Sequence, residues 1–300
     1  MSKMKVGYVG IIGRPNVGKS TLLNYLIGEK IAITSEKPQT TRSQILGIKT
    51  TEKAQIIFID TPGIHKPKHE LGSFMNKEAK SVASGVDLLY LIVDVSQPFG
   101  VGDNYVLELV KRYKLPVFLI LNKIDLITKD ELIKLIDDYS KRYDFDEIIP
   151  ISAFNHTNIN RLIDVTKDYL EDGIKYYPDD QVVDYPEQFI ISELIREKIL
   201  FYTEEEIPHS VAVVIEKVIR KKSNFVIYAL ILVERDSQKG IIIGKQGRMI
   251  KQIGIDARKD IEGILGEKIF LELFVRVEKD WRNKKSKLKQ LGYIPIEIEE

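Results

Sequence analysis

Residues 13–20 read Gly13-Arg14-Pro15-Asn16-Val17-Gly18-Lys19-Ser20, a stretch that fits the pattern G-x-x-x-x-G-K-S/T. It follows an apolar, strand-like run at residues 6–12 and opens a helix-like run at residues 20–27. In this setting the glycines let backbone N–H groups point at phosphate oxygens, and the helix N-terminus adds partial positive charge. We therefore expect Lys19 to bridge the β- and γ-phosphates of a nucleotide and the Ser20 hydroxyl to bind Mg²⁺. The residues expected to surround the phosphates are Gly13, Arg14, Pro15, Asn16, Val17, Gly18, Lys19, Ser20 and Thr21.

Strand-like and helix-like runs alternate through the first 170 residues. The run at 88–95 is almost continuously apolar, which is typical of a strand buried on both faces. This alternation predicts an α/β domain with a mostly parallel sheet and helices on both faces. Further strands are expected at 44–49, 55–60, 117–122 and 148–151, and further helices at 104–113, 129–139 and 158–170.

A second motif selects the base of the nucleotide. Asn122, Lys123 and Asp125 follow a buried strand, where ligand-binding loops lie in such sheets. A carboxylate at Asp125 can accept hydrogen bonds from N1–H and the 2-amino group of guanine, whereas adenine offers neither donor. We expect Asn122 to tie this loop to the phosphate loop and the Lys123 stem to cover the base. Ser152-Ala153 follow the next strand, where a backbone N–H can meet guanine O6, so the motifs favour GTP over ATP.

Two further segments are expected to sense the γ-phosphate. Asp60 ends an apolar strand and is expected to hold Mg²⁺ through water, while the Gly63 N–H reaches the γ-phosphate. Thr41 lies in the loop after the first helix and is the expected Mg²⁺ ligand there. Because both segments touch only the γ-phosphate and its ion, they are expected to order with GTP and relax after hydrolysis. The nucleotide contacts expected around this strand end are Asp60, Thr61, Pro62, Gly63 and Ile64.

The catalytic apparatus has a gap at Ile64. Ras-like GTPases place a water-orienting glutamine directly after Asp-x-x-Gly, and isoleucine cannot orient water. We therefore expect slow intrinsic hydrolysis, with catalytic roles for Lys19, Thr41 and Gly63. One hypothesis is that the Asn16 side-chain carbonyl helps to bind K⁺ in place of an arginine finger; the alternative is that Asn16 only shapes the loop. Arg14 and Arg42 are the weaker finger candidates.

A polar, turn-rich stretch with Pro178, Asp179, Asp180 and Pro186 marks a change of organisation. We predict a nucleotide-binding domain at 1–173, a linker at 174–186 and a smaller α+β domain at 187–300. The second domain is expected to run α-β-β-α-α-β with a final basic helix. Its elements are predicted at 187–202, 211–219, 225–233, 240–247 (glycine-rich), 248–265, 269–277 and 279–291, with a hairpin turn at 221–224.

Composition narrows the classes of function. There is no cysteine, which excludes disulfides, zinc–thiolate sites, iron–sulfur clusters and a cysteine nucleophile. No apolar run reaches the roughly 18 residues of a membrane span, so we expect a soluble, cytoplasmic protein. Residues 1–180 hold 24 basic and 24 acidic side chains, whereas residues 210–289 hold 19 basic and 10 acidic, a net charge of +9. The basic second part favours an anionic partner, although a solvated lysine-rich face is the alternative.

A Gly-x-x-Gly segment in the second domain indicates which kind of anionic partner this domain binds. Gly244 and Gly247 lie between two helical stretches, the arrangement with which KH domains clamp about four single-stranded nucleotides. The order of elements and the surrounding positive charge support this interpretation, and the helix-first order resembles the type II KH topology. Ile241–Ile243, Ile250 and Ile253 are expected to form the groove floor. The RNA contacts that we expect are Ile243, Gly244, Lys245, Gln246, Gly247, Arg248, Ile250 and Lys251.

Together these motifs resemble the Era family of bacterial GTPases, in which a Ras-like P-loop G domain precedes a type II KH domain. The resemblance covers nearly the whole chain and includes the isoleucine after Asp-x-x-Gly. It implies a factor that binds 16S rRNA near its 3′ end and acts in assembly of the small (30S) ribosomal subunit. We expect its other partners to be GTP and GDP, and the chain to be monomeric. The resemblance also implies a loose peripheral link to the inner membrane. The residues that carry it are 13–20, 38–42, 60–64, 122–125, 177–181, 195–198, 244–247, 281–282 and 291–293.

Two alternatives remain open at this stage. In one, the chain is a GTPase whose basic C-terminal domain docks on a membrane or a protein partner, with the basic stretch at 281–289 as the contact. In the other, the chain is an RNA-binding module whose nucleotide site only stabilises the fold. Salt-sensitive RNA binding would exclude the first, and different RNA affinities with GTP and GDP would exclude the second.

Overall fold

The computed structural model describes residues 4–35, 37, 40–67, 69–221 and 224–293. Pro38 and Gln39 of the family resemblance, and Lys222 and Ser223 of the expected hairpin turn, lie outside the described residues. The chain divides into two compact units. The first comprises Met1–Ala32, Thr41–Lys66 and Met75–Asp184, and the second comprises Ile33–Thr40, Pro67–Phe74 and Tyr185–Glu300.

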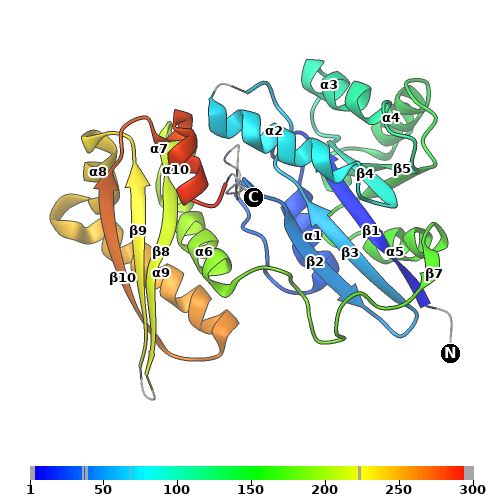
Figure 1. The fold of residues 1–300 in the computed structure, drawn as a ribbon. Helices are drawn as coiled ribbons and strands as arrows, with labels where there is room; N and C mark the ends of the chain where they lie inside the picture. The colour runs from blue at the N-terminus through cyan, green and yellow to red at the C-terminus, as the bar shows by residue number, and fades with distance from the viewer. Residues whose placement is uncertain (1–3, 36, 38–39, 68, 222–223, 294–300) are drawn as a thin grey trace, which may run out of the picture. The chain divides into compact units, whose positions relative to one another are not determined.

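The first unit is built on a seven-stranded sheet with the order β2-β3-β1-β4-β5-β6, in which β7 pairs with β1 (Figure 1). The β1–β3, β1–β4, β4–β5 and β5–β6 pairs are parallel, and only β2 and β7 run antiparallel to their neighbours. The predicted mostly parallel sheet is therefore confirmed. The strands are β1 (Met4–Gly13), β2 (Ile45–Thr50), β3 (Ala54–Asp60), β4 (Leu88–Asp94), β5 (Val117–Asn122), β6 (Glu147–Ile151) and β7 (Glu171–Gly173).

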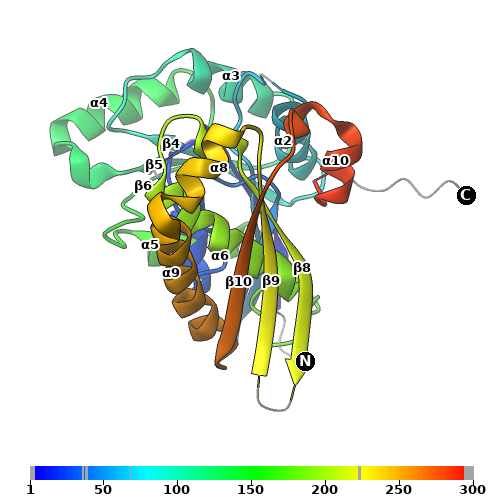
Figure 2. The same ribbon diagram turned by 90° about the vertical axis from the view of Figure 1, so that its left-hand side faces the viewer.

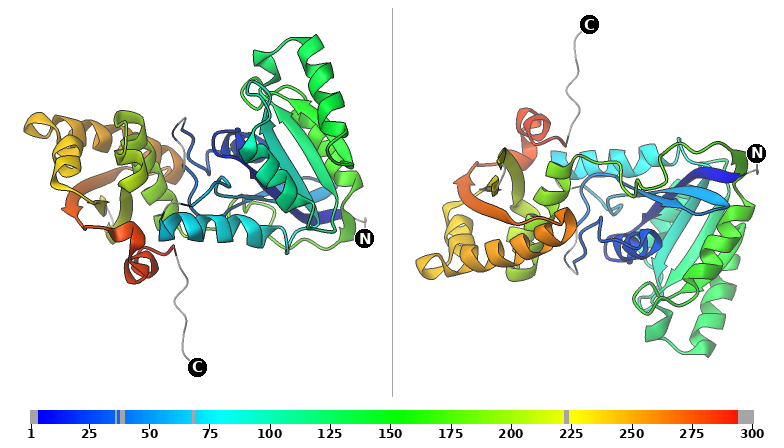
Figure 3. Two further views of the ribbon diagram at one scale, coloured as in Figure 1. Left: turned by 90° about the horizontal axis from the view of Figure 1, so that it is seen from above. Right: turned by 90° about the horizontal axis from the view of Figure 1, so that it is seen from below.

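Helices pack on both faces of this sheet (Figure 3). Ala79, Val106 and Tyr139 from three different helices join the apolar side chains of β4 and β5 in one core cluster. On the other face, Thr166 bonds to the Tyr90 hydroxyl. The helices are α1 (Lys19–Ile27), α2 (Glu70–Val82), of which residues 75–82 belong to this unit, α3 (Val101–Val110), the 3-10 turn η1 (Ile124–Leu126), α4 (Lys129–Ser140) and α5 (Ile159–Asp168).

Helix α2 was not predicted from the sequence. Its buried residues Leu71, Met75, Ala79 and Val82 recur every three or four positions and form one apolar face. Most of the intervening positions are polar or charged, which lowers the mean hydropathy of the segment and obscured this periodicity.

The stretch predicted as a linker hydrogen-bonds to the first unit. The amide of fully buried Gln55 accepts from the backbone N–H groups of Tyr176 and Tyr177 at 2.8 and 3.0 Å and donates to the Tyr177 carbonyl. Farther along, Ile48 N–H donates to the Val182 carbonyl at 2.8 Å, and Asp184 N–H donates to the Leu46 carbonyl. The segment therefore covers the free edge of β2.

The second unit contains a three-stranded sheet with the order β10-β9-β8, antiparallel between β8 and β9 and parallel between β9 and β10 (Figure 2). Ile191, Ile242 and Ile253 belong to three helices whose apolar sides share one core with this sheet. The predicted order α-β-β-α-α-β is confirmed, with one additional short helix, α7. The elements are α6 (Glu187–Tyr202), α7 (Ile207–Ser210), β8 (Ala212–Lys221), β9 (Asn224–Val233), α8 (Asp236–Ile243), η2 (Lys245–Gly247), α9 (Arg248–Leu265), β10 (Ile269–Val277), η3 (Trp281–Asn283) and α10 (Lys285–Gln290).

The single basic helix predicted at 279–291 is wrong. Asp280 adopts a left-handed backbone with φ 56°, and the segment forms the 3-10 turn η3 followed by the short helix α10. Trp281 and Leu288 are fully buried, and the Trp281 indole donates to the Ser210 carbonyl at 2.9 Å. The apolar side chains of this segment therefore anchor it to its own unit.

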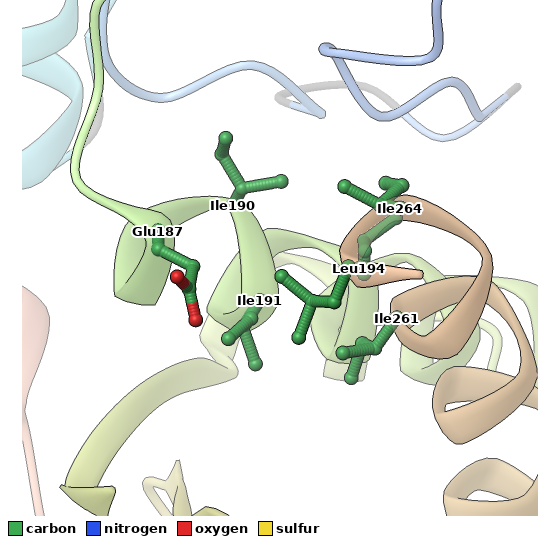
Figure 4. Close-up of a pocket in the computed structure, with 7 residues that line it drawn as sticks. Glu187, Ile190, Ile191, Leu194, Ile261 and Ile264 are labelled. Carbon is green, nitrogen blue, oxygen red and sulfur yellow. The ribbon is translucent and has the colours of Figure 1, made fainter. Parts of the chain in front are cut away.

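One small apolar cavity lies between α6 and α9 (Figure 4). Its volume is about 20 Å³, which is room for one water molecule. Isoleucine and leucine side chains form most of its wall, so it offers a water too few hydrogen-bond partners. We interpret it as a packing gap. The lining residues are Glu187, Ile190, Ile191, Leu194, Ile261, Ile264 and Leu265. Within the described ranges, no helix combines the length and hydropathy needed to cross a bilayer.

Candidate nucleotide site and nucleic-acid interface

The phosphate loop connects β1 to α1 and requires glycine at two positions. A Cβ on Gly13 would lie 2.5 Å from the Ile92 carbonyl oxygen. Gly18 has φ +98°, and a Cβ there would lie 2.2 Å from Nδ2 of Asn122. Gly18 also caps α1 without a side-chain acceptor, so the N–H groups of the first helical turn remain available to an anion.

Lys19 places its ammonium group inside this loop. Its Nζ donates to the Arg14 carbonyl at 2.9 Å, and the residue is only 6% exposed. Burial lowers the pKa of Lys19, and the negative charge of Asp60 partly opposes this shift. A phosphate group in the loop would supply the negative charge that this buried cation lacks.

The three predicted Mg²⁺ ligands lie together. The Ser20 hydroxyl donates to Asp60 Oδ2 at 2.6 Å and lies 2.8 Å from Thr41 Oγ1, which is 3.4 Å from the same carboxylate oxygen. Asp60 is fully buried, and its Oδ1 has no hydrogen-bond partner among the residues that the structure describes. Burial raises the pKa of Asp60, while Lys19 and the hydrogen bonds oppose the shift. This set of oxygen donors fits Mg²⁺.

The Asp-x-x-Gly segment contacts the phosphate loop through its backbone. A Cβ on Gly63 would lie 2.6 Å from the Pro15 nitrogen, and Ile64 N–H donates to the Gly13 carbonyl at 3.1 Å. The Ile64 side chain is 1% exposed and lies in the core cluster beside Ile12. Only the backbone of Ile64 therefore lies at the nucleotide site, and its side chain contributes to the core.

The predicted tie between the base loop and the phosphate loop is present. Asn122 Nδ2 donates to the Val17 carbonyl at 2.7 Å, and its Oδ1 accepts from Ala153 N–H at 2.9 Å. Asp125 is exposed at the start of η1, beside Lys123, whose φ is +70°. One amide side chain thus holds three loops at a common edge of the sheet.

The expected backbone contact with guanine O6 stays a prediction. Ser152 N–H already donates to the Thr157 carbonyl at 3.3 Å, and Ala153 N–H donates to Asn122. A contact from either N–H to O6 would therefore have to replace an existing bond. Sequence spacing places these two residues at the base edge, but it does not reveal how their N–H groups are used.

The loop between α8 and α9 presents a different kind of surface. Gly244 and Gly247 have φ +71° and +73°, and Gln246 shares this left-handed region at +55°. A Cβ on Gly244 would lie 2.6 Å from the Met249 Cβ, whereas a Cβ on Gly247 would meet nothing within 4 Å. Around the loop the predicted polar contacts Lys245, Gln246, Arg248 and Lys251 are all exposed.

The sequence of the chain matches two family models, one described as 50S ribosome-binding GTPase over residues 8–123 and one described as KH domain over residues 206–282. A solved structure of a tyrosine-to-alanine variant of Era from Aquifex aeolicus, bound to GDP·AlF4⁻, is 40% identical. The match covers 97% of this chain and 99% of that chain with a TM-score of 0.94. The chain belongs to the Era family.

A second Era structure matches equally well, with 40% identity, the same coverage of both chains and a TM-score of 0.94. That Era is in complex with MgGDPNP and nucleotides 1506–1542 of 16S ribosomal RNA. The resemblance inferred from the sequence motifs, and the fold class of a G domain followed by a KH domain, are therefore confirmed.

The floor predicted for the KH groove of this Era-family chain is only partly correct. Ile242 and Ile253 are fully buried in the core, because the helical repeat of α8 and α9 turns them toward the sheet. Ile241 remains 52% exposed, and Ile243 and Ile250 are half-buried. The accessible apolar surface beside the loop is thus smaller than the sequence indicated.

The two weaker arginine-finger candidates of this Era-family site are held by contacts within the protein or are buried. Arg14 forms an ion pair of 2.7 Å with Asp103 of α3, and Arg42 is 1% exposed. Asn16 is exposed in the phosphate loop, with a left-handed φ of +63°.

Sequence reasoning missed Asp94, which ends β4 and binds the ammonium group of Lys123 at 2.5 Å. The available signal was an acidic residue ending the buried strand beside the strand that carries the base motif.

Proposed function

We propose that this chain is a GTP-hydrolysing switch that binds 16S rRNA near its 3′ end through its KH domain and acts in small (30S) ribosomal subunit assembly. The observation that carries the proposal is the cluster of Ser20, Thr41 and Asp60 beside the buried ammonium of Lys19. The Era complexes with GDP·AlF4⁻, and with MgGDPNP and a 16S rRNA fragment, support it.

Mg²⁺ is the implied cofactor. The hydroxyls of Ser20 and Thr41 would ligate it, and Asp60 would hold its water shell, as the unpartnered Oδ1 of the buried carboxylate supports. When bound, Mg²⁺ neutralises charge on the β- and γ-phosphate oxygens. Lys19 then binds the same phosphates, and the loop N–H groups orient them. The residues proposed for these roles come from β1, α1, β3 and the Thr41 loop.

Hydrolysis is proposed to be slow. The Ile64 side chain lies in the core, so the position that carries glutamine in Ras-like GTPases supplies no polar group. We propose that Asn16 helps to hold K⁺ beside the phosphates and so supplies the missing positive charge. The exposure of Asn16 in the phosphate loop is compatible with this role.

Nucleotide state is proposed to control RNA affinity. Thr41 and Gly63 would contact only the γ-phosphate and its ion, so GTP and GDP differ in the order that they impose on these segments. Linkage requires RNA to favour GTP by the same factor by which GTP favours RNA. A cytoplasmic location follows from the proposed rRNA target.

Membrane docking is the weaker alternative for the basic C-terminal segment. Trp281 and Leu288 are the apolar residues that an interfacial helix would insert, and both are fully buried within the second unit. Electrostatic attraction of its lysines to anionic lipid would remain, which supports at most a loose peripheral contact.

The deciding experiment measures affinity for a short single-stranded RNA that matches the 3′ end of small-subunit rRNA. Binding is compared with a non-hydrolysable GTP analogue and with GDP, at one fixed salt concentration. We expect tighter binding with the analogue. Equal binding would keep the RNA function but remove the switch, and no binding in either state would favour the membrane or protein partner.

A matched pair of variants locates the RNA surface. Lys245→Asp reverses one charge on the Gly-x-x-Gly loop, and Lys268→Asp makes the same change beyond the far end of α9, where the side chain is 92% exposed. We expect only the first to weaken RNA binding strongly. Equal losses would indicate general electrostatic attraction without a defined groove.

A further inference from the structure

Asp94 ends β4 directly beside the base-binding loop. The β4–β5 ladder pairs Asp94 with Asn122, and Val95 N–H donates to the Asn122 carbonyl at 3.0 Å. The two strand ends are therefore fixed relative to each other at the point where the base motif begins. Asp94 is not part of the base-binding motif at residues 122–125.

Both carboxylate oxygens of Asp94 are engaged. Oδ2 accepts from Lys123 Nζ at 2.5 Å, while Oδ1 accepts from the Ser96 N–H at 3.0 Å and from its hydroxyl at 2.6 Å. The Asp94 side chain is 13% exposed and that of Lys123 is 33% exposed. Although burial raises the pKa of Asp94, the bonds from Lys123 and Ser96 outweigh it and hold the pKa below its usual value. The Asp94 carboxylate is therefore partly shielded from water and held by its two partners.

Lys123 needs such a partner. Its backbone has φ +70°, a region that a lysine occupies only where its surroundings hold it. A lysine side chain has four rotatable bonds and loses much rotamer freedom when it is held in one position. The contact with Asp94 fixes the ammonium end of the Lys123 side chain, so both ends of its methylene stem are held in place.

We propose that Asp94 is a positioning residue for nucleotide binding: by fixing the Lys123 ammonium, it holds the lysine stem as an apolar wall for the face of the guanine base. This inference rests on the proposed guanine site. In this proposal Asp94 acts on the nucleotide only through Lys123, so it changes base affinity alone. Its effect is the same for GDP and GTP, because both carry the same base.

The principal test is Asp94→Asn, which keeps the shape and the Ser96 contacts but removes the charge. We expect dissociation of fluorescently labelled GDP to accelerate about five- to tenfold, as for loss of one partly buried ion pair. A labelled GTP analogue should show the same factor, and single-turnover hydrolysis of bound GTP should keep its rate. Asp138→Asn is the control, since Asp138 of α4 forms a more exposed ion pair with Arg142, which lies just beyond the end of that helix.

A double-mutant cycle separates positioning from general stability. Lys123→Met keeps an apolar stem without the charge, so Asp94→Asn should have no further effect on GDP dissociation in that background. Asp94→Glu should restore part of the wild-type dissociation rate. Because the nucleotide-free melting temperature of each variant is measured in parallel, a folding defect would be recognised directly.

Two results would overturn the inference. One is wild-type GDP dissociation in Asp94→Asn; the other is an equal effect of this change in the Lys123→Met background. The failure of the underlying guanine site is a separate outcome: the wild-type protein would then bind ADP as tightly as GDP.

Discussion

The phosphate loop at residues 13–20 and the Gly-x-x-Gly loop at residues 244–247 resemble each other locally. Each ends in a glycine of left-handed φ that caps a following helix without a side-chain bond, Gly18 before α1 and Gly247 before α9. Their surroundings differ. A Cβ on Gly18 would collide with Asn122, whereas a Cβ on Gly247 would stand in open space. Likewise Lys19 is buried and Lys245 is exposed.

The same backbone feature, a left-handed glycine before a helix, can therefore serve two kinds of ligand. A small anion can be enclosed, so the phosphate loop packs against β4 and β5 and its cation loses water. A polymer must enter and leave along an open path, so the Gly-x-x-Gly loop keeps its charges hydrated at the surface. Substitutions at matched positions should therefore have unequal effects.

The largest expected difference is between Gly18→Ala and Gly247→Ala. At Gly18 the added Cβ is both strained by φ +98° and obstructed by Asn122, so we expect loss of measurable nucleotide binding and a destabilisation of about 3 kcal/mol or more. At Gly247 only the strain remains, about 1 kcal/mol. Thermal unfolding of both variants, with nucleotide titration, checks this. Equal losses of stability would contradict the enclosure argument.

Next in size is the comparison of the two lysines. Lys19→Ala removes a buried charge that is proposed to face the phosphates, and we expect nucleotide affinity to fall by about 3 kcal/mol, more than a hundredfold. Lys245→Ala removes one proposed contact with RNA phosphate, for which we expect a loss of about 1 kcal/mol in RNA affinity and a salt dependence reduced by about one ion. Titrations at several salt concentrations measure both. If Lys245→Ala leaves the salt dependence unchanged, Lys245 does not contact RNA phosphate.

A smaller effect comes from the buried carboxyl of Asp60, whose Oδ1 accepts no hydrogen bond within the described part of the chain. The carboxyl ionises near pH 3.8 when unperturbed and at higher pH in the fold, because burial raises its pKa. Between those two values the folded chain binds more protons than the unfolded one, so the free energy of unfolding decreases as pH rises through this window. Asp60→Asn should remove that slope and stabilise the nucleotide-free protein at neutral pH by about 1–3 kcal/mol.

Denaturant unfolding at several pH values measures the slope for the wild type and for Asp60→Asn. The same variant should lose Mg²⁺-dependent nucleotide binding, which separates the stability effect from the functional one. If Asp60→Asn is less stable than the wild type at neutral pH, the buried charge of Asp60 does not destabilise the fold.

The smallest expected effect concerns Asn16, an exposed residue of the enclosed loop. We expect GTP hydrolysis to be about tenfold faster in K⁺ than in Na⁺ at matched ionic strength, which is about 1.4 kcal/mol of barrier. Asn16→Ala should abolish this difference, while Gln246→Ala, an equally exposed residue with left-handed φ in the other loop, should leave it intact. Identical rates in the two salts would remove the K⁺ hypothesis.

Sequence reasoning succeeded where a motif fixes backbone geometry. The spacing of Gly13, Lys19 and Ser20, and the strand ends at Asp60 and Asn122, led directly to contacts that the structure contains. Most of the order of elements followed from apolar periodicity in the same way, although α2 and α7 were not predicted.

Prediction failed where tertiary burial decides. Nothing local shows that Trp281 and Leu288 pack inward or that Asp280 breaks the expected helix with a left-handed backbone. Nor does spacing show that Ala153 N–H is already used by Asn122, or that Ile242 and Ile253 belong to the core. These facts depend on partners distant in sequence, which a pattern of residues along the chain does not identify.

The hydrogen bonds of residues 176–184 have a consequence for handling the protein. A protease cuts backbone that is exposed and free to extend, and buried or hydrogen-bonded backbone resists such nicking. Gln55 holds Tyr176 and Tyr177, and the edge of β2 holds Val182 and Asp184. The polar composition of this stretch suggests a domain boundary at which the chain could be cut. We nevertheless expect limited proteolysis to leave it intact. A separate G domain should therefore be cloned to include Asp184, because ending it at residue 173 would expose the edge of β2.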